Sequence, residues 1–198
     1  MSDSLPDGDS PALAVVELSS IARAFLVADA MIKRAPALLW RTHTISPGHF
    51  LIFLTGGVAE VDESCRAGLL DAAPHIVDHV FLPRPEPQIL AFMRKPAEGA
   101  LIDALGIIET RNCVAAIRGA DAALKVAAVT LVHLHLGQGI GGKGVFAFTG
   151  ELPDVQAALE EGVYAAREEL VLAREEIPAP HGGMTLSMLG LGSRSPDY

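Results

Sequence analysis

The sequence predicts an α+β fold made of two tandem copies of one domain, and three observations support this. Residues 12–35 and 104–127 repeat the same pattern, with Glu17, Asp29 and Lys33 returning as Glu109, Asp121 and Lys125. Each copy carries apolar runs and helical stripes in the order β-α-β-β-α-β. A length of 198 residues also suits two units of about 90 residues each.

Each copy opens with an apolar run, residues 13–18 and 105–110, whose length and β-branched content favour a strand. A helix follows, because apolar residues recur at helical spacing: Ile21, Phe25, Ala28 and Ile32 in the first copy, and Cys113, Ile117, Ala120 and Leu124 in the second. Two strands come next, at residues 38–45 and 49–55 and at residues 129–136 and 144–149.

A second helix is indicated by a further apolar stripe: Val58, Val61, Cys65 and Leu69, matched by Leu152, Val155, Leu159 and Val163. The last strand, residues 76–82 or 170–177, ends in a proline cluster, Pro83-Arg84-Pro85 or Pro178-Ala179-Pro180. We therefore expect the helices to cover one face of a mainly antiparallel sheet.

The domain boundaries follow from these elements. We expect a flexible N-terminus at 1–11, a first domain at 12–86, a linker at 87–103 with a short helix around Ile89 to Met93, a second domain at 104–181 and a loose tail at 182–198.

The composition excludes several functional classes. Half of the residues are apolar, 20% are charged, and the mean hydropathy of +0.35 suits a chain that buries surface against partners. The net charge is −9 and the basic residues are scattered, so we expect no nucleic-acid partner. The uncharged stretch 126–142 contains two His and four Gly, so we expect no membrane span. The acidic, polar start is unlike a signal peptide, which predicts a cytosolic location.

The two cysteines show no metal-binding spacing. Cys113 stands where the first copy has Ile21, and Cys65 stands where the second copy has Leu159. This exchange with aliphatic residues favours small buried apolar side chains, with a reactive thiol as the alternative.

The repeated residues resemble the bacterial microcompartment (BMC) shell domains. The segment ALGIIETRNCVAAIRGADAALKVAAVTLV has the family's short strand ending in Glu-Thr and its helix carrying A-D-x-x-x-K; GIGGKG and the proline cluster also match. The first copy follows the same pattern with Leu18 in place of the Thr. Between Ala12 and His181 the chain is similar to the tandem-domain class, which forms trimers shaped as pseudohexamers.

This resemblance implies a structural, non-enzymatic shell protein: a homotrimeric tile of the microcompartment shell, in the cytoplasm, with a central pore for small metabolites. Its partners would be other BMC shell proteins at the tile edges. The pore would be lined by two loops, Ser46-Pro47-Gly48-His49 and Gly139-Ile140-Gly141-Gly142. The resemblance also places five residues at tile edges: Asp29, Lys33, Arg84, Asp121 and Lys125.

One departure bears on cofactors. The chain most resembles the branch found in propanediol-utilisation compartments, which has a Cys before the Pro-Gly of the first central loop and carries an iron–sulfur cluster on the threefold axis. Here that position is Ser46, whose hydroxyl is no substitute for a thiolate. We therefore expect no cluster, no other cofactor and no metal. A cofactor-carrying redox subunit remains the alternative.

Two further patterns have competing interpretations. The run from Gly137 to Gly144 nearly spells a phosphate-binding loop, which is the only support for a ferredoxin-like small-ligand protein; Gly144 stands where that motif needs Ser or Thr. His133 and His135 share one face of a strand, but a metal site would need a third ligand. The repeated acids Glu17 and Glu109 lack a partner for acid–base catalysis, so we interpret them as hydrogen-bonded structural acids.

Overall fold

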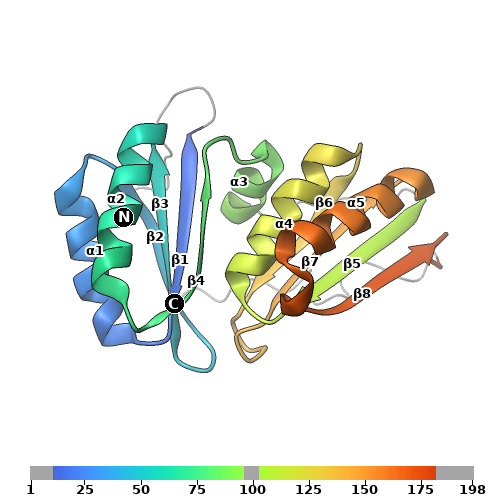
Figure 1. The fold of residues 1–198 in the computed structure, drawn as a ribbon. Coiled ribbons are helices and arrows are strands. Elements are labelled where there is room, and N and C mark those ends of the chain that lie inside the picture. The colour runs from blue at the N-terminus through green and yellow to red at the C-terminus, as the bar shows by residue number, and fades with distance from the viewer. Residues whose placement is uncertain (1–10, 96–102, 182–198) are drawn as a thin grey trace. The chain divides into compact units, whose positions relative to one another are not determined.

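A computed structural model describes residues 11–95 and 103–181 of the chain (Figure 1). The contacts divide it into two compact units. The first unit comprises the chain up to Pro85, together with Asn112–Val114 and Leu136–Lys143. The second unit comprises the remainder, beginning at Glu86. The expected N-terminus, the tail and residues 96–102 of the expected linker lie outside the described residues, apart from Pro11.

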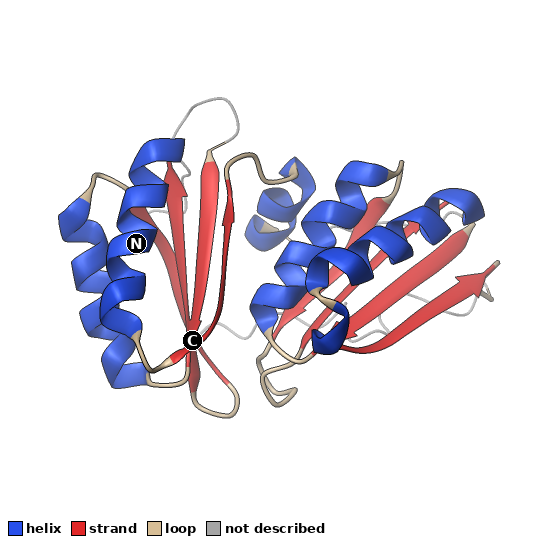
Figure 2. Ribbon diagram, viewed as in Figure 1, coloured by secondary structure: helices blue, strands red, loops and turns tan. Residues whose placement is uncertain are grey.

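The first unit is a four-stranded antiparallel sheet with two helices on one face (Figures 1 and 2). The strands lie in the order β2-β3-β1-β4. In chain order the elements are β1 (Ala12–Leu18), α1 (Ile21–Arg34), β2 (Leu38–Ile45), β3 (His49–Gly56), α2 (Val58–Ala72) and β4 (Ile76–Leu82). The Ser20 hydroxyl caps α1 by accepting the Arg23 backbone N–H, which satisfies one of the free donors at the helix start.

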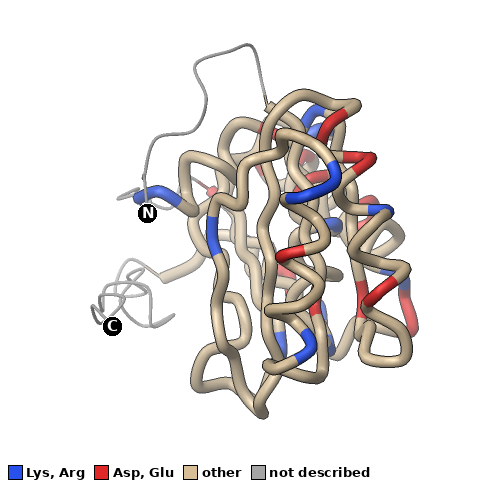
Figure 3. The backbone as a smooth tube through the Cα atoms, turned by 90° about the vertical axis from the view of Figure 1, so that its left-hand side faces the viewer, with Lys and Arg blue, Asp and Glu red and all other residues tan. Residues whose placement is uncertain are grey.

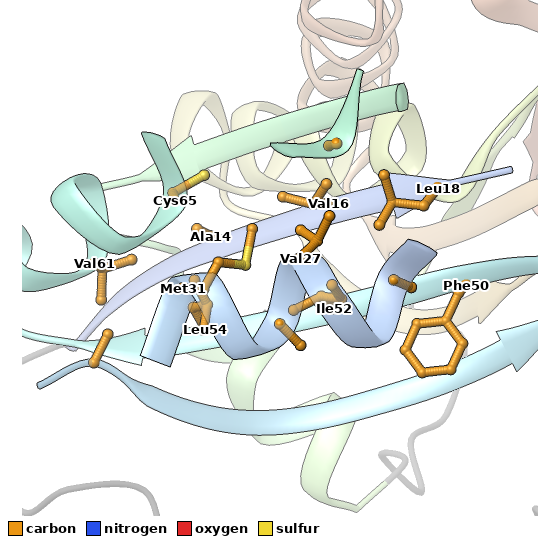
Figure 4. Close-up of a cluster of buried hydrophobic side chains, with 14 of the residues drawn as sticks. Ala14, Val16, Leu18, Val27, Met31, Phe50, Ile52, Leu54, Val61 and Cys65 are labelled. Atoms are coloured by element: carbon orange, nitrogen blue, oxygen red, sulfur yellow. The ribbon is translucent and has the colours of Figure 1, made fainter. Parts of the chain in front are cut away.

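The core of this unit lies between the sheet and its helices (Figure 4). Side chains from β1 and β3 converge there with Val27 and Met31 of α1 and with Val61 and Cys65 of α2. The two helices approach closely at Gly68, where an added Cβ would overlap the Met31 side chain. A glycine on α2 therefore makes room for the largest core side chain of α1.

The second unit repeats this arrangement, with strand order β6-β7-β5-β8 and helices α4 and α5 on one face (Figure 2). Its elements are β5 (Ala104–Thr110), α4 (Cys113–Val126), β6 (Thr130–Leu136), β7 (Gly144–Gly150), α5 (Leu152–Ala166), a 3-10 turn (Glu168–Leu170) and β8 (Val171–Pro178). The helices are close-packed, since a Cβ at Gly119 would lie 2.8 Å from the Gly162 carbonyl oxygen. The helix α3 (Pro87–Arg94) belongs to this unit and buries Ile89, Leu90 and Phe92.

The predicted fold class is confirmed, since each repeat has four antiparallel strands and two helices in the expected order. One detail differs. The buried face of α1 consists of Ala24, Val27, Ala28 and Met31, whereas three of the four residues that indicated the helix are exposed: Ile21, Phe25 and Ile32. The helix has apolar residues on two sides, and only one side faces its own sheet.

Candidate pore loops and assembly surfaces

The two candidate pore loops lie against each other within the first unit. Ser46 to Gly48 join β2 to β3, and Gly137 to Lys143 join β6 to β7. At Gly142, where φ is +83°, an added Cβ would lie 2.6 Å from the Ser46 carbonyl oxygen and 3.2 Å from the Pro47 side chain. Only glycine combines this backbone conformation with so close an approach.

The tips of both loops are open. Gly48, Gly139 and Gly141 have φ angles of +112°, +73° and +71°, and no heavy atom lies within 4 Å of an added Cβ at any of them. Ile140 between them is partly exposed. The loops therefore present backbone rather than bulky side chains, and exposed N–H groups in such turns attract anions.

His49 is anchored to a buried acid at the base of the first loop. Its Nδ1 lies 2.9 Å from Glu17 Oε1, and the other Glu17 oxygen accepts the Cys113 backbone N–H at 2.9 Å. Burial raises the pKa of Glu17, while the hydrogen bond from His49 opposes this rise. The carboxylate also lies at the N-terminus of α4, where the helix dipole favours negative charge. Glu17 is thus a hydrogen-bonded structural acid, as the sequence indicated, and His49 is held on it.

The residues at these loops do not fit a thiolate-bound cluster. Ser46 offers a hydroxyl, and the nearest thiol, Cys113, is buried and points to the carbonyl oxygens of Gly142 and Lys143 at 3.7 and 3.9 Å. Burial raises the pKa of Cys113 well above its usual range, which leaves it a protonated apolar side chain. Cys65 is buried in the helix core of the first unit, where its pKa rises to about 11.

The expected edge residues occupy unequal surroundings in the two repeats. Lys33 pairs with Asp29 at 2.5 Å, and these side chains are 72% and 54% exposed. The matching pair, Lys125 and Asp121, has the same 2.5 Å distance, but the Asp121 side chain is only 7% exposed. Asp121 also accepts the Glu86 backbone N–H at 2.7 Å, which ties it to the start of α3. The fifth edge candidate, Arg84, is also exposed.

An apolar surface on α1 is the feature that the sequence reasoning missed. Phe25 is 66% exposed and Ile32 is 46% exposed, although their counterparts in α4, Ile117 and Leu124, are 0% and 6% exposed. Ile21 is also open, whereas its counterpart Cys113 is buried. We call Ile21, Phe25 and Ile32 the open face of α1. The sequence of α1 could have indicated it, because two apolar stripes on one helix require two covering surfaces.

The histidines on the strands are not gathered into a metal site. His133 is buried, its ring centre lies 6.0 Å from that of His135, and burial with the nearby His135 lowers the pKa of His133 to about 4. Within residues 11–95 and 103–181, no three metal-binding side chains are grouped.

Charge and hydropathy add two findings about the described part of the chain. On α1 and α2, basic and acidic positions are interspersed rather than separated by sign (Figure 3). No described helix has both the length and the apolar content needed to cross a bilayer.

Comparisons with known proteins agree with this geometry. The family model of the BMC domain matches twice, at residues 12–85 and 104–180. The bacterial microcompartment shell protein PduT of Citrobacter freundii is 36% identical over 91% of this chain and 98% of its own length. The shell protein EutM of Salmonella typhimurium is 40% identical over 42% of this chain and 85% of its own length.

A solved structure agrees as well. A microcompartment protein from Desulfitobacterium hafniense superposes with a TM-score of 0.75 at 37% identity, over 87% of this chain and 96% of that chain.

Proposed function

This chain belongs to the bacterial microcompartment shell proteins, with two BMC domains in tandem, and we propose that three copies form one pseudohexameric shell tile. It is a structural protein of the microcompartment shell, and such proteins assemble with other shell components. In the proposed tile, first and second repeats alternate around a threefold axis, so each repeat has a repeat of the other kind on either side.

The observation that carries this proposal is the unequal exposure of α1 and α4. The two helices align without a gap, yet the positions that are buried on α4 are exposed on α1. Covering the open face would remove three large apolar side chains from water, a gain of about 1.5–3 kcal/mol for each one fully buried. A second copy of the chain supplies a surface already suited to this kind of face, because the repeats share one fold.

The pore of the proposed tile lies where the loops meet at the axis. Ser46, Pro47, Gly48 and His49 would contribute from the first repeat, and Gly139, Ile140, Gly141 and Gly142 from the second. Positive φ angles and open space at Gly48, Gly139 and Gly141 support this position, since backbone can approach an axis closely there. Selection would rest on pore width, backbone N–H donors and the Ser46 hydroxyl, which suits small polar or anionic metabolites.

The edges of the proposed tile carry Asp29, Lys33, Arg84, Asp121 and Lys125, and they contact neighbouring shell proteins. Lys33 is 72% exposed and able to meet another tile. Lys125 is 45% exposed, but its partner Asp121 is held by the backbone of α3. The two kinds of edge therefore differ in exposure, which would let neighbours distinguish them.

The tile has no chemistry of its own in this proposal. The buried acid Glu17 accepts hydrogen bonds from His49 and from the Cys113 N–H, and burial keeps the nearby Cys113 thiol protonated, so the pair does not form an activated nucleophile. A redox tile with an axial cluster is disfavoured by Ser46 and by the inward position of Cys113. A small-ligand protein is disfavoured because the glycine-rich run joins two strands and not a strand to a helix.

Phe25→Glu tests the assembly. A charge on the open face should convert the trimer to monomers, because an unpaired carboxylate would be buried there. Leu70→Glu is the matched control: Leu70 is 84% exposed and its counterpart in the second repeat, Tyr164, is 80% exposed, so neither repeat covers this position. Light scattering of both variants should give a monomer mass for the first and the wild-type mass for the second. A trimer with Phe25→Glu would refute the proposed contact.

A further inference from the structure

The second unit shows how a segment covers the end of the first helix of a repeat. Glu86 donates its backbone N–H to Asp121 Oδ1 at 2.7 Å, just before α3 begins. The Gln88 side chain then donates to the Val129 carbonyl at 3.2 Å and accepts the Leu131 N–H at 2.9 Å. These bonds fix α3 over the last turns of α4 and the start of β6.

The first unit carries the same frame without this cover. Asp29, Ala37 and Leu39 match Asp121, Val129 and Leu131 in the repeat. The turn is also the same, since Ala37 N–H donates to the Ala35 carbonyl at 2.8 Å and Val129 N–H donates to the Ala127 carbonyl at 2.9 Å.

Two of the three matched positions differ in exposure between the repeats, whereas Ala37 and Val129 are both buried. The side chain of Asp29 is 54% exposed against 7% for Asp121. Leu39 is partly exposed, whereas Leu131 is buried. A surface built like the α3 docking site is therefore open on the first repeat.

The chain has a segment in the matching place. Leu82 of β4 pairs with Leu13, and Ile177 of β8 pairs with Leu105, so the two proline clusters follow their strands in the same register. Glu86 to Arg94 continue from the first cluster, and residues 182–198 continue from the second, a stretch longer than the eight residues of α3. Apolar residues recur in this stretch at Met184, Leu186, Met188 and Leu189.

We propose that residues 182–198, here called the C-terminal segment, cover the Asp29–Ile32–Leu39 surface of a second copy of this chain. The segment after the first repeat covers the second repeat, as α3 shows. In a threefold ring of alternating repeats, the repeat that follows the second one is the first repeat of the neighbouring copy. This inference thus rests on the proposed trimer and specifies one contact between its neighbouring copies.

The contact differs from that of α3 in one respect. Gly183 stands where α3 has Gln88, so the C-terminal segment has no amide to bridge the backbone at Ala37 and Leu39. Its binding is therefore mainly apolar, through side chains such as Met184 and Leu186 on Ile32 and Leu39.

Two measurements test the proposed contact of the C-terminal segment. In the first, the full chain is compared with a chain that ends at His181 by native mass spectrometry over a dilution series. We expect the truncated trimer to dissociate at a protein concentration at least tenfold higher than the full-length trimer. Equal dissociation of the two trimers would overturn the contact of the C-terminal segment but not the proposed trimer, whereas a full chain that is monomeric would overturn both.

The second measurement is disulfide trapping in the full chain. The pair Ile32→Cys with Met184→Cys should give covalent dimers and trimers on a non-reducing gel, with little background because Cys65 and Cys113 are buried. Leu70→Cys with Met184→Cys is the control and should stay monomeric. A cross-linked product at the mass of one chain, or equal ladders for both pairs, would overturn the proposal.

Discussion

Replacing Glu17 by leucine should be among the most destabilising single changes in the first unit. Glu17 is fully buried and its two oxygens serve two partners, the Cys113 N–H and His49 Nδ1, each at 2.9 Å. Leucine is one bond shorter than glutamate and accepts no hydrogen bond. The change leaves a buried backbone N–H unsatisfied, which costs about 1–3 kcal/mol, and it removes a second bond worth about 1 kcal/mol.

The expected total is about 3 kcal/mol, reduced in part because leucine also removes the cost of burying a charge. For a chain of this length that corresponds to a fall in Tm of about 5–10 °C. The Tm of Glu17→Gln should fall by less than half as much, since the glutamine amide oxygen still accepts the Cys113 N–H. Differential scanning calorimetry of the three proteins gives the comparison.

A surface change provides the matched control. Asp62→Asn removes a carboxylate that pairs with Arg66 at 2.9 Å on exposed helix surface, and such pairs contribute only a few tenths of a kcal/mol. Its Tm should stay within about 1 °C of wild type. If Glu17→Leu shifts Tm no more than Asp62→Asn does, the carboxylate does not anchor the loop and α4 as described.

Three other predictions concern buried groups. Burial lowers the pKa of His133 to about 4 from an unfolded value of 6.5, so the stability that the neutral ring contributes is present above pH 6.5 and is lost as pH falls toward 4, by up to about 3 kcal/mol. In urea unfolding, His133→Gln should reduce the dependence of the unfolding free energy on pH over this range, whereas the control His79→Gln, at an exposed position, should keep the wild-type dependence. The same pH dependence in all three proteins would refute the assignment. Gly119→Ala should destabilise the protein by about 1–3 kcal/mol, since its Cβ would meet the Gly162 carbonyl oxygen, and an unchanged or raised Tm would contradict this packing. Cys65 and Cys113 should resist iodoacetamide at pH 8 until the protein is unfolded in urea, because burial keeps both thiols protonated; mass spectrometry showing fast labelling of the native protein would be inconsistent with that burial.

Much of the fold could be predicted because its signals are local. Apolar runs of six to eight residues predicted the strands, and a change of period to 3.6 predicted the helices. The repeat then doubled each observation, since every element was indicated twice. The resemblance named Gly142 only as a pore-lining residue, and its close approach to the Ser46 carbonyl oxygen became evident only from the structure.

The side of a helix that faces its own sheet was not predictable. On α1, Phe25 and Val27 are both apolar and both lie on helical stripes, yet Val27 is buried and Phe25 is open. The hydrophobic pattern predicts that an apolar side chain will be buried, but it does not predict whether its own domain or another chain buries it. The apolar stripe of α1 therefore predicted a helix but did not identify the side that its own sheet covers.

Contacts between distant segments were equally hidden. Glu17 and Cys113 are 96 positions apart, and no local pattern links a strand-end acid to the start of a helix in the next repeat. Asp29 and Asp121 have the same neighbours in sequence, but only Asp121 receives the backbone of α3. Identical residues have different environments here because the start of α3 covers Asp121, whereas the Asp29 side chain is 54% exposed.

The most direct test of the proposed tile is an experimental structure of the assembled particle, by crystallography or electron microscopy. We predict a threefold ring of three chains, about 62 kDa from three copies of 20.8 kDa, with the Ser46 and Gly141 loops at the axis and the open face of α1 covered by a neighbouring copy. A particle in which Phe25 remains solvent-exposed, or in which these loops lie away from the axis, would contradict the account.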